Sequence, residues 1–377
     1  MTTDLYLPPK GEWERRDASS LGVDQSKLDE AVQFAKDNEI NWPMDPSKGQ
    51  VGDDATEWAA KLGPFKDRGG PAGVVIKDGY IVAEWGDVER VDLTFSATKS
   101  YVATIAGLAF DRGMIKSTSD AVMDYERGKS ITMVNSGEPV DGFDTDQNRG
   151  ITWEHLLQQT SEWEGTLYTK PDIVDWNRKG MRASGDFKRH TRQAPGGHSE
   201  YNDVRVNRTA LALLAVWGES LPDVLAREVM NPIGSSGTWE WHGYGEHSTV
   251  NIDGLVIESV SGGAHWGGGL WVDTLDHARF GMLCLNRGRW GDKQIISEEW
   301  IDMMTAPSDQ NHQYGYMWWL NTGHAFHKNA SEDTFVAVGA GGNCVVIDPE
   351  KDLVVVTRWC EDVAGVVDLA AQAVGSN

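Results

Sequence analysis

The 377-residue sequence predicts an α/β (α+β) fold in which one antiparallel sheet is flanked by helices and carries an inserted, mainly helical subdomain. Strand patterns occur near both ends of the chain, whereas the middle is dominated by helical and loop patterns. Because the terminal strands need a common layer to bury their apolar side chains, we expect residues 1–115 and 256–377 to form the sheet domain. Residues 116–255 then form the helical subdomain.

The expected strands are short apolar segments bounded by turn residues. The first two, 72–77 and 80–86, are separated by Asp78-Gly79, a dipeptide typical of a two-residue hairpin. Apolar residues at helical spacing predict helices near both termini, in the middle of the chain and before the last strands. The further strands are expected within 314–321, 334–339, 344–349 and 353–360, and helices within 26–38, 203–234, 274–288 and 366–375.

The charge of the chain excludes several classes of partner. Asp and Glu number 57 against 34 Lys and Arg, which gives a formal net charge of −23. Such a field repels nucleic acid and anionic lipid, so neither a nucleic acid nor a membrane is an expected partner. No apolar run approaches the roughly 18 residues that a membrane span requires, and the first 17 residues lack the pattern of a secretory signal. We expect a cytoplasmic location, in a bacterium.

Metal and cofactor sites are not expected from the motifs. Cys284, Cys344 and Cys360 are far apart and lack zinc-ligand spacing, which favours buried free thiols. The ten histidines show no metal-ligand spacing either. Residues 128–130 resemble the end of a phosphate-binding loop, but Met123 stands where that loop needs Gly. The sequence therefore predicts no metal and no cofactor.

The stretch "LTFSATKSYVA", residues 93–103, carries the strongest chemical signal. Ser96 follows two apolar residues and begins a helical pattern, so Lys99 lies one turn further along the same face. A serine hydroxyl is a weak nucleophile at neutral pH, and a neutral, buried lysine one turn away can take its proton. The same spacing also fits a helix cap followed by a surface lysine. The apolar surroundings favour the nucleophile with its base.

With these residues in view, the sequence resembles the superfamily of serine β-lactamases, penicillin-binding proteins and related esterases, especially its class C-like branch. Ser96-Ala97-Thr98-Lys99 matches the S-x-x-K motif of that family. Glu162 stands where the family's Thr-Ser-Gly-like turn has Gly. The other matching segments follow in the family's order along the chain and lie at 151–165, 194–203, 229–238, 267–281 and 339–356.

The resemblance implies catalytic roles for individual residues. Ser96 would be the acylated nucleophile, Lys99 would take its proton, and Tyr201 would relay that proton to the leaving group. Which of Lys99 and Tyr201 is the resting base stays open. Asp203 falls where the family's Tyr-x-Asn motif has Asn, a position that contacts substrate. The backbone N–H groups of Ser96 and Ala340 would form the oxyanion hole.

The third family motif predicts the type of substrate. It falls on Ala337-Val338-Gly339 and therefore lacks the basic residue that clamps a substrate carboxylate in β-lactamases. We expect Gly339 and Trp266 to contact substrate, beside Asp203. Further aromatic and histidine side chains that could form pocket walls, or ordinary core, are Trp163, Trp176 and His265.

These features predict a serine hydrolase that forms an acyl-enzyme on Ser96. The missing clamp and the net charge of −23 favour a carboxylesterase or amidase acting on small neutral substrates. A true β-lactamase or D-alanyl peptidase is one alternative, and a non-catalytic ligand-binding protein on the same scaffold is another. The expected partner is a small ester, amide or lactam, and the sequence leaves the oligomeric state open.

Overall fold

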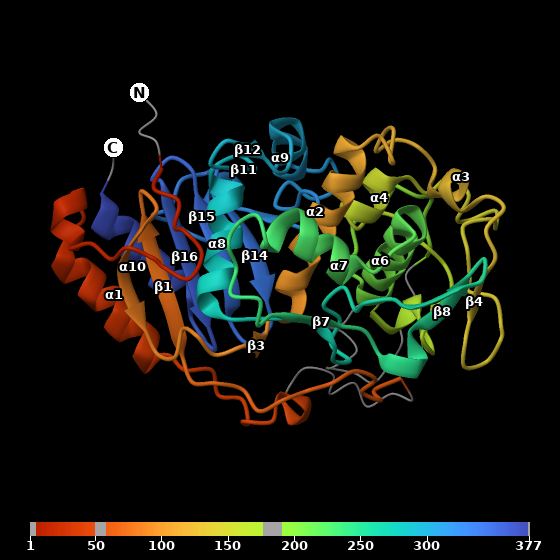
Figure 1. The fold of residues 1–377 in the computed structure, drawn as a ribbon, viewed down its shortest axis with the longest axis horizontal. Coiled ribbons are helices and arrows are strands. Elements are labelled where there is room, and N and C mark those ends of the chain that lie inside the picture. Colours follow the sequence, from red (N-terminus) through yellow and green to blue (C-terminus); the bar gives the residue numbers. More distant parts are fainter. Residues whose placement is uncertain (1–4, 50–57, 176–190, 376–377) are drawn as a thin grey trace.

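A six-stranded antiparallel sheet joins the two ends of the chain in the computed structural model, which describes residues 5–49, 58–175 and 191–375 (Figure 1). The strand order is β13-β14-β15-β16-β1-β2, and β1 pairs with β16 along its whole length. The predicted sheet and hairpin are confirmed. The strands are β1 (Ala72–Lys77), β2 (Tyr80–Trp85), β13 (Trp319–Leu320), β14 (Phe335–Gly339), β15 (Asn343–Asp348) and β16 (Leu353–Arg358).

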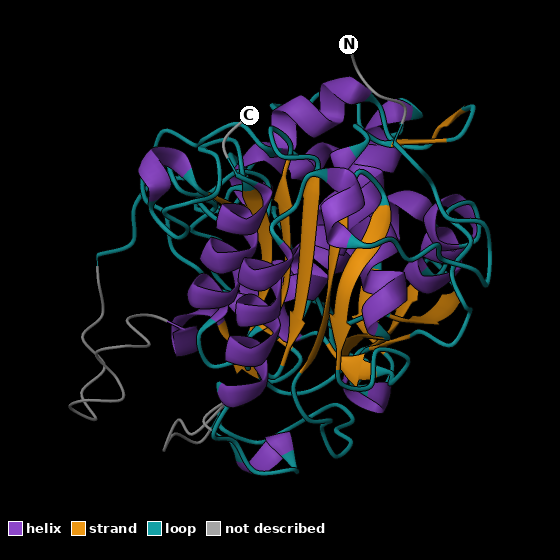
Figure 2. Ribbon diagram, turned by 90° about the vertical axis from the view of Figure 1, so that its left-hand side faces the viewer, coloured by secondary structure: helices purple, strands orange, loops and turns teal. Residues whose placement is uncertain are grey.

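Both faces of this sheet are covered by helices, as Figure 2 shows. Successive side chains of a strand point to opposite faces. Val75 therefore packs in the cluster that includes helices α1 (Gln25–Asp37) and α10 (Val363–Val374), while Val74 packs in the cluster that includes α8 (Thr274–Leu285). Covering both faces explains why the strands are continuous apolar runs instead of alternating ones.

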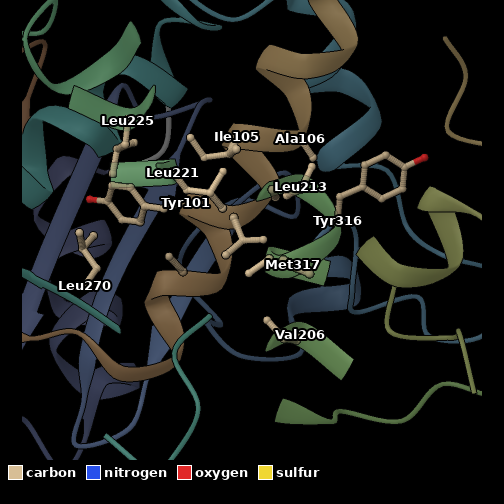
Figure 3. Close-up of a cluster of buried hydrophobic side chains, with 14 of the residues drawn as sticks. Tyr101, Ile105, Ala106, Val206, Leu213, Leu221, Leu225, Leu270, Tyr316 and Met317 are labelled. Carbon is tan, nitrogen blue, oxygen red and sulfur yellow. The ribbon is translucent and has the colours of Figure 1, made fainter. Parts of the chain in front are cut away.

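Helices α2 (Thr98–Asp111) and α6 (Asp203–Trp217) run through the core beside the sheet. Figure 3 shows Tyr101, Ile105 and Ala106 of α2 among apolar side chains of α6 and of α7 (Leu221–Leu225). Every residue of α2 from Thr98 to Ala109 is buried. The first turn of α2 is consequently held by packing on all sides.

The chain also contains short strands that the sequence analysis did not anticipate, and several of them, such as β4, β7 and β8, lie within the segment predicted as mainly helical. A three-stranded sheet has the order β4-β8-β9, and a second one has the order β3-β10-β7. Strand β9 crosses the expected domain boundary between residues 255 and 256. The division into two domains stays a prediction. The strands are β3 (Asp92–Leu93), β4 (Ile131–Met133), β5 (Thr166–Leu167), β6 (Lys170–Pro171), β7 (Glu240–His242), β8 (Thr249–Ile252), β9 (Leu255–Glu258), β10 (Gly269–Val272), β11 (Arg289–Trp290) and β12 (Lys293–Gln294).

Short helices connect these elements. They are α3 (Val122–Glu126), α4 (Trp153–Leu157), α9 (Glu298–Met304), the 3₁₀ helices η1 (Ala18–Leu21), η2 (Pro46–Lys48), η3 (Phe95–Ala97), η4 (Asp172–Asp175), η6 (Gly245–His247) and η7 (Thr322–His324), and the π-helix η5 (Ala226–Met230). Within the described ranges, no single helix meets the length and hydropathy needed to cross a bilayer, and one bent pair, residues 203–217 with 221–230, meets them by length and composition alone.

The three cysteines are free and buried, as predicted. Burial raises the pKa of the Cys344 thiol to about 12 and that of Cys360 to about 11. Burial also raises the pKa of Cys284. All three thiols therefore remain protonated at neutral pH and behave as small apolar side chains.

Candidate active site

The turn that presents Ser96 is built on strained backbone. Phe95 has φ of 49°, a left-handed conformation that is costly for a bulky residue. Its buried ring lies edge-on to Trp42 and Trp359, with ring centroids 5.8 and 6.0 Å away, and this packing fixes the turn. In the run from Asp92 to Ala109, Ser96 is the residue that retains partial exposure. The strain thus brings one hydroxyl to the surface of a buried segment.

Lys99 reaches the Ser96 hydroxyl one helical turn away. Its Nζ donates a hydrogen bond of 2.8 Å to Ser96 Oγ, and the lysine side chain is 2% exposed. The carbonyl of Gly263 accepts a bond of 3.2 Å from Lys99 Nζ and another of 3.2 Å from Ser96 Oγ. One backbone oxygen therefore orients both groups at once.

Asp203, the first residue of α6, forms an ion pair with Lys99. Its Oδ1 lies 2.8 Å from Lys99 Nζ, and both side chains are at most 2% exposed. Its Oδ2 accepts bonds from the backbone N–H and from Nδ1 of His265, at 3.1 and 2.9 Å. Because an ionised carboxylate only accepts hydrogen bonds, the proton of His265 lies on Nδ1. The carboxylate of Asp203 therefore contacts Lys99 through Oδ1 and His265 through Oδ2.

A third charged group stands behind this pair. Asp175 Oδ2 accepts a bond of 2.6 Å from the backbone N–H of Asp203. Ligand atoms of Asp175, Asp203 and His265 lie within 4.8 Å of one another, an arrangement that could hold a metal ion. The Lys99 ammonium already lies against Asp203 Oδ1, and its positive charge would repel a divalent cation at this place.

Tyr201 joins the site from the residue before the N-cap of α6. Its ring centroid lies 4.8 Å from Lys99 Nζ. The ring stacks on Trp319 at 5.7 Å and lies edge-on to Tyr314 at 6.2 Å, while Trp319 contacts Phe326 at 5.7 Å. Burial, followed by the charge of Tyr201, raises the pKa of Tyr314 well above its usual value. Tyr314 is therefore uncharged at neutral pH. We call the four residues Tyr201, Tyr314, Trp319 and Phe326 the aromatic wall.

The end of β14 lies directly against the turn that carries Ser96. A Cβ on Gly339 would be 2.0 Å from the carbonyl oxygen of Thr94, so only glycine fits this contact. Ala337 is 1% exposed, whereas Val338 is 37% exposed. Ala340 follows the last residue of the strand and packs against the cluster that holds Phe95. The structure thus places Gly339 and Ala340 beside the nucleophile turn.

Other candidate wall residues are placed in the core. Trp266 is fully buried, and its indole N–H donates to the carbonyl of Trp58 at 3.2 Å. Its ring contacts that of His265 at 4.1 Å, so Trp266 supports the histidine. Trp163 is also fully buried and donates to Gly142 at 3.2 Å. Trp176 lies outside the described residues.

Two features of the site were not assigned by sequence reasoning. Asp175 gave no signal, because its contact with α6 exists only in the folded chain. The acceptor carbonyl of Gly263 lies in a glycine-rich segment whose φ values are positive at Gly263, Gly267 and Gly268. Glu162, which stands where the family has Gly, does adopt a left-handed φ of 50° and lies 3.5 Å from Arg205. The glycines at 262–263 and 267–269 were the available sequence signal for a constrained loop.

The profile of the Beta-lactamase family matches residues 60–358, most of the chain, and the protein belongs to this family. Its family and relatives indicate a hydrolase of the serine β-lactamase and penicillin-binding protein fold. Over 331 residues the chain is 25% identical to the "Putative D-alanyl-D-alanine carboxypeptidase" of Escherichia coli O157:H7, covering 75% of this chain and 76% of that protein.

Two solved structures share the fold. A penicillin-binding protein homologue from Caulobacter crescentus has a TM-score of 0.58 at 13% identity, covering 93% of this chain and 99% of its own. EstCE1, described as a hydrolase with promiscuous acyltransferase activity, has a TM-score of 0.56 at 15% identity, covering 95% and 99%. Together with the family match, these structures confirm the predicted fold class and the family resemblance.

Proposed function

We propose that the protein is a serine hydrolase that forms an acyl-enzyme on Ser96. The observation that carries this proposal is the 2.8 Å hydrogen bond from a buried Lys99 to a partly exposed Ser96 hydroxyl. Ser96 Oγ attacks the substrate carbonyl carbon, Lys99 and Tyr201 move the proton to the leaving group, and water then releases the acyl group. The N–H groups of Ser96 and Ala340 would stabilise the oxyanion.

We propose small neutral esters or amides as the substrates. The family's carboxylate clamp is replaced by Ala337, which is buried, and the next residue on β14 is the half-exposed Val338. The apolar side chains of Ala337 and Val338 and the aromatic wall beside Tyr201 favour a substrate with an uncharged, apolar group. The net charge of −23 acts in the same direction, because it disfavours anionic substrates.

The test combines intact-protein mass spectrometry with product release. The purified protein is mixed separately with p-nitrophenyl acetate, p-nitrophenyl butyrate and nitrocefin. We expect ester turnover, an acyl mass on the peptide that contains Ser96, and little nitrocefin hydrolysis. Ser96→Ala should lose both the adduct and the turnover. Ser100→Ala is the matched control, because that serine lies four residues further along, in α2, and donates its hydroxyl to the carbonyl of Met317.

Two results would redirect the assignment. Fast nitrocefin hydrolysis would favour the β-lactamase or D-alanyl peptidase alternative, to which the carboxypeptidase relative gives weight. Tight binding without turnover on any of the three compounds would favour the ligand-binding alternative. Persistent acylation in Ser96→Ala would remove Ser96 from the mechanism altogether.

A further inference from the structure

The charge environment of Lys99 differs from what a neutral lysine base requires. An ammonium in the interior is stabilised by a carboxylate at hydrogen-bond distance, and Asp203 Oδ1 lies 2.8 Å from Lys99 Nζ. Ser96 Oγ lies at the same distance on another side of that nitrogen. Lys99 thus stands between a hydroxyl that must lose a proton and a carboxylate that can accept one.

We infer that Asp203 is a positioning residue that also accepts a proton from Lys99 transiently during acylation of Ser96, with His265 holding its carboxylate in place. This inference rests on the proposed serine hydrolase function. It assigns to Asp203 a role that an Asn at the same place could not perform, because an amide oxygen is not a base at neutral pH. Lys99 then acts as a relay between two oxygens.

The proton transfers balance within the residues present. As Ser96 Oγ bonds to the carbonyl carbon, its proton passes to Lys99 Nζ while one ammonium proton passes to Asp203 Oδ1. Lys99 stays an ammonium, Asp203 becomes a carboxylic acid, and the negative charge moves to the carbonyl oxygen. When the tetrahedral intermediate collapses, the proton returns through Lys99 and Tyr201 to the leaving oxygen or nitrogen. The carbonyl carbon's bond to that atom breaks, and the leaving group departs neutral.

The second carboxylate oxygen is held by His265. Two of its groups, the backbone N–H and Nδ1–H, donate to Asp203 Oδ2, which leaves Oδ1 directed at Lys99. These two bonds fix the rotamer of the carboxylate while it gains and loses a proton. Among the described residues, the titratable groups around Asp203 include Lys99, Asp175, Tyr244, His265 and Tyr314, and the Tyr201 ring lies against Lys99.

The decisive variant is Asp203→Asn, which restores the amide of the family motif. We expect the rate of Ser96 acylation by p-nitrophenyl acetate at pH 7 to fall by about 10²- to 10⁴-fold. In the variant Asp203 can no longer take a proton from Lys99, so Lys99 itself must be neutral to accept the Ser96 proton, and the rise of kcat/KM with pH should move to higher pH. A merely structural role would lower the rate without moving this profile.

Two further measurements keep the test decisive. Glu126→Gln is the control, because Glu126 of α3 pairs with Arg208 of α6, the helix that begins at Asp203, and the substitution should leave both rate and profile unchanged. If Asp203→Asn fails to fold, His265→Ala and His265→Asn replace it. The alanine variant loses the side-chain donor to Asp203, so we expect about a tenfold loss or more, whereas the Asn amide can restore the bond and most of the rate.

Failure of this inference is separable from failure of the proposed function. A wild-type protein that acylates Ser96 establishes the nucleophile, and Asp203 is then judged by itself. Wild-type acylation rates and an unshifted pH profile in Asp203→Asn would overturn the acceptor role. Equal rates in His265→Ala and wild type would overturn the holding role. Absence of any adduct in the wild type would instead overturn the proposed function on which the inference rests.

Discussion

Gly263 offers the sharpest test of how the backbone supports the nucleophile. Its φ of 92° lies in a region that L side chains rarely adopt, and its carbonyl accepts hydrogen bonds from both Ser96 and Lys99. A Cβ at this position would lie 2.4 Å from the carbonyl oxygen of Phe95 and 2.9 Å from Thr98 Cβ. Gly263→Ala therefore forces two backbone segments of the site apart.

The size of the effect follows from these distances. Relieving a 2.4 Å contact to ordinary van der Waals separation needs a shift of about 1 Å. A misplacement of about 1 Å in a catalytic arrangement costs on the order of 10²-fold in rate. The positive φ adds about 1–2 kcal/mol of strain in the folded state. We therefore expect Gly263→Ala to lower kcat/KM for p-nitrophenyl acetate about 100-fold and to lower Tm.

Gly254 provides a matched control. It has nearly the same φ, 96°, but a Cβ there would meet no atom within 4 Å. Gly254→Ala should lose the same 1–2 kcal/mol or so to backbone strain and keep wild-type kcat/KM. The assay is steady-state ester hydrolysis at 25 °C, with melting followed by circular dichroism. A folded Gly263→Ala protein with wild-type kcat/KM would refute the reasoning that its carbonyl positions Ser96 and Lys99.

Three other predictions concern charge, specificity and the thiols. Burial and then the charge of Asp276 raise the pKa of Asp273 to about 6, so its ionised form destabilises the folded state above that pH. Asp273→Asn keeps the helix cap and should increase the free energy of unfolding by about 2 kcal/mol at pH 8. In urea titrations this gain should shrink as the pH falls toward 4. An equal or lower stability at pH 8 would contradict it. Trp319→Ala removes the ring stacked on Tyr201 and should lower kcat/KM for p-nitrophenyl butyrate about three- to tenfold, with Trp319→Phe close to wild type; equal losses in the two variants would argue against an aromatic wall. The three buried thiols should not react with Ellman's reagent at pH 8 until denaturant is added, and rapid reaction of the native protein would show that one is accessible.

The main sheet could be predicted because its signals are local. The Asp78-Gly79 turn and the apolar strands around it specify a hairpin within a few residues, and β1 and β2 match the expected segments. The strands of the β4-β8-β9 sheet were missed because they are only three or four residues long and leave many side chains exposed. Such short segments carry little hydrophobic periodicity, and the pairing of β4 with β8 depends on tertiary contacts.

In the candidate site, too, contacts between residues close in sequence could be predicted, whereas contacts between distant residues could not. Ser96 and Lys99 are three residues apart on one helix, so their contact follows from helical geometry alone. Asp203 and His265 are 62 residues apart, and no spacing rule connects them. The positive φ of Phe95 was also invisible in the sequence, because it depends on aromatic packing from distant segments. Local geometry therefore predicted the contact between Ser96 and Lys99, but not the groups that surround it.

The exchange of Asn for Asp at position 203 shows why a motif match does not fix a mechanism. The two side chains have nearly the same shape, so the segment that contains Tyr201 still matches the family pattern. Their charges differ, because a carboxylate 2.8 Å from a buried lysine nitrogen stabilises the charged form of the lysine whereas a neutral amide does not. An ion pair this deeply buried is stabilised by further hydrogen bonds to its carboxylate, and two N–H groups of His265 supply such bonds to Asp203 Oδ2. The Asp at position 203 and its bonds from His265 therefore have to be considered together in the inferred proton transfer from Ser96 through Lys99.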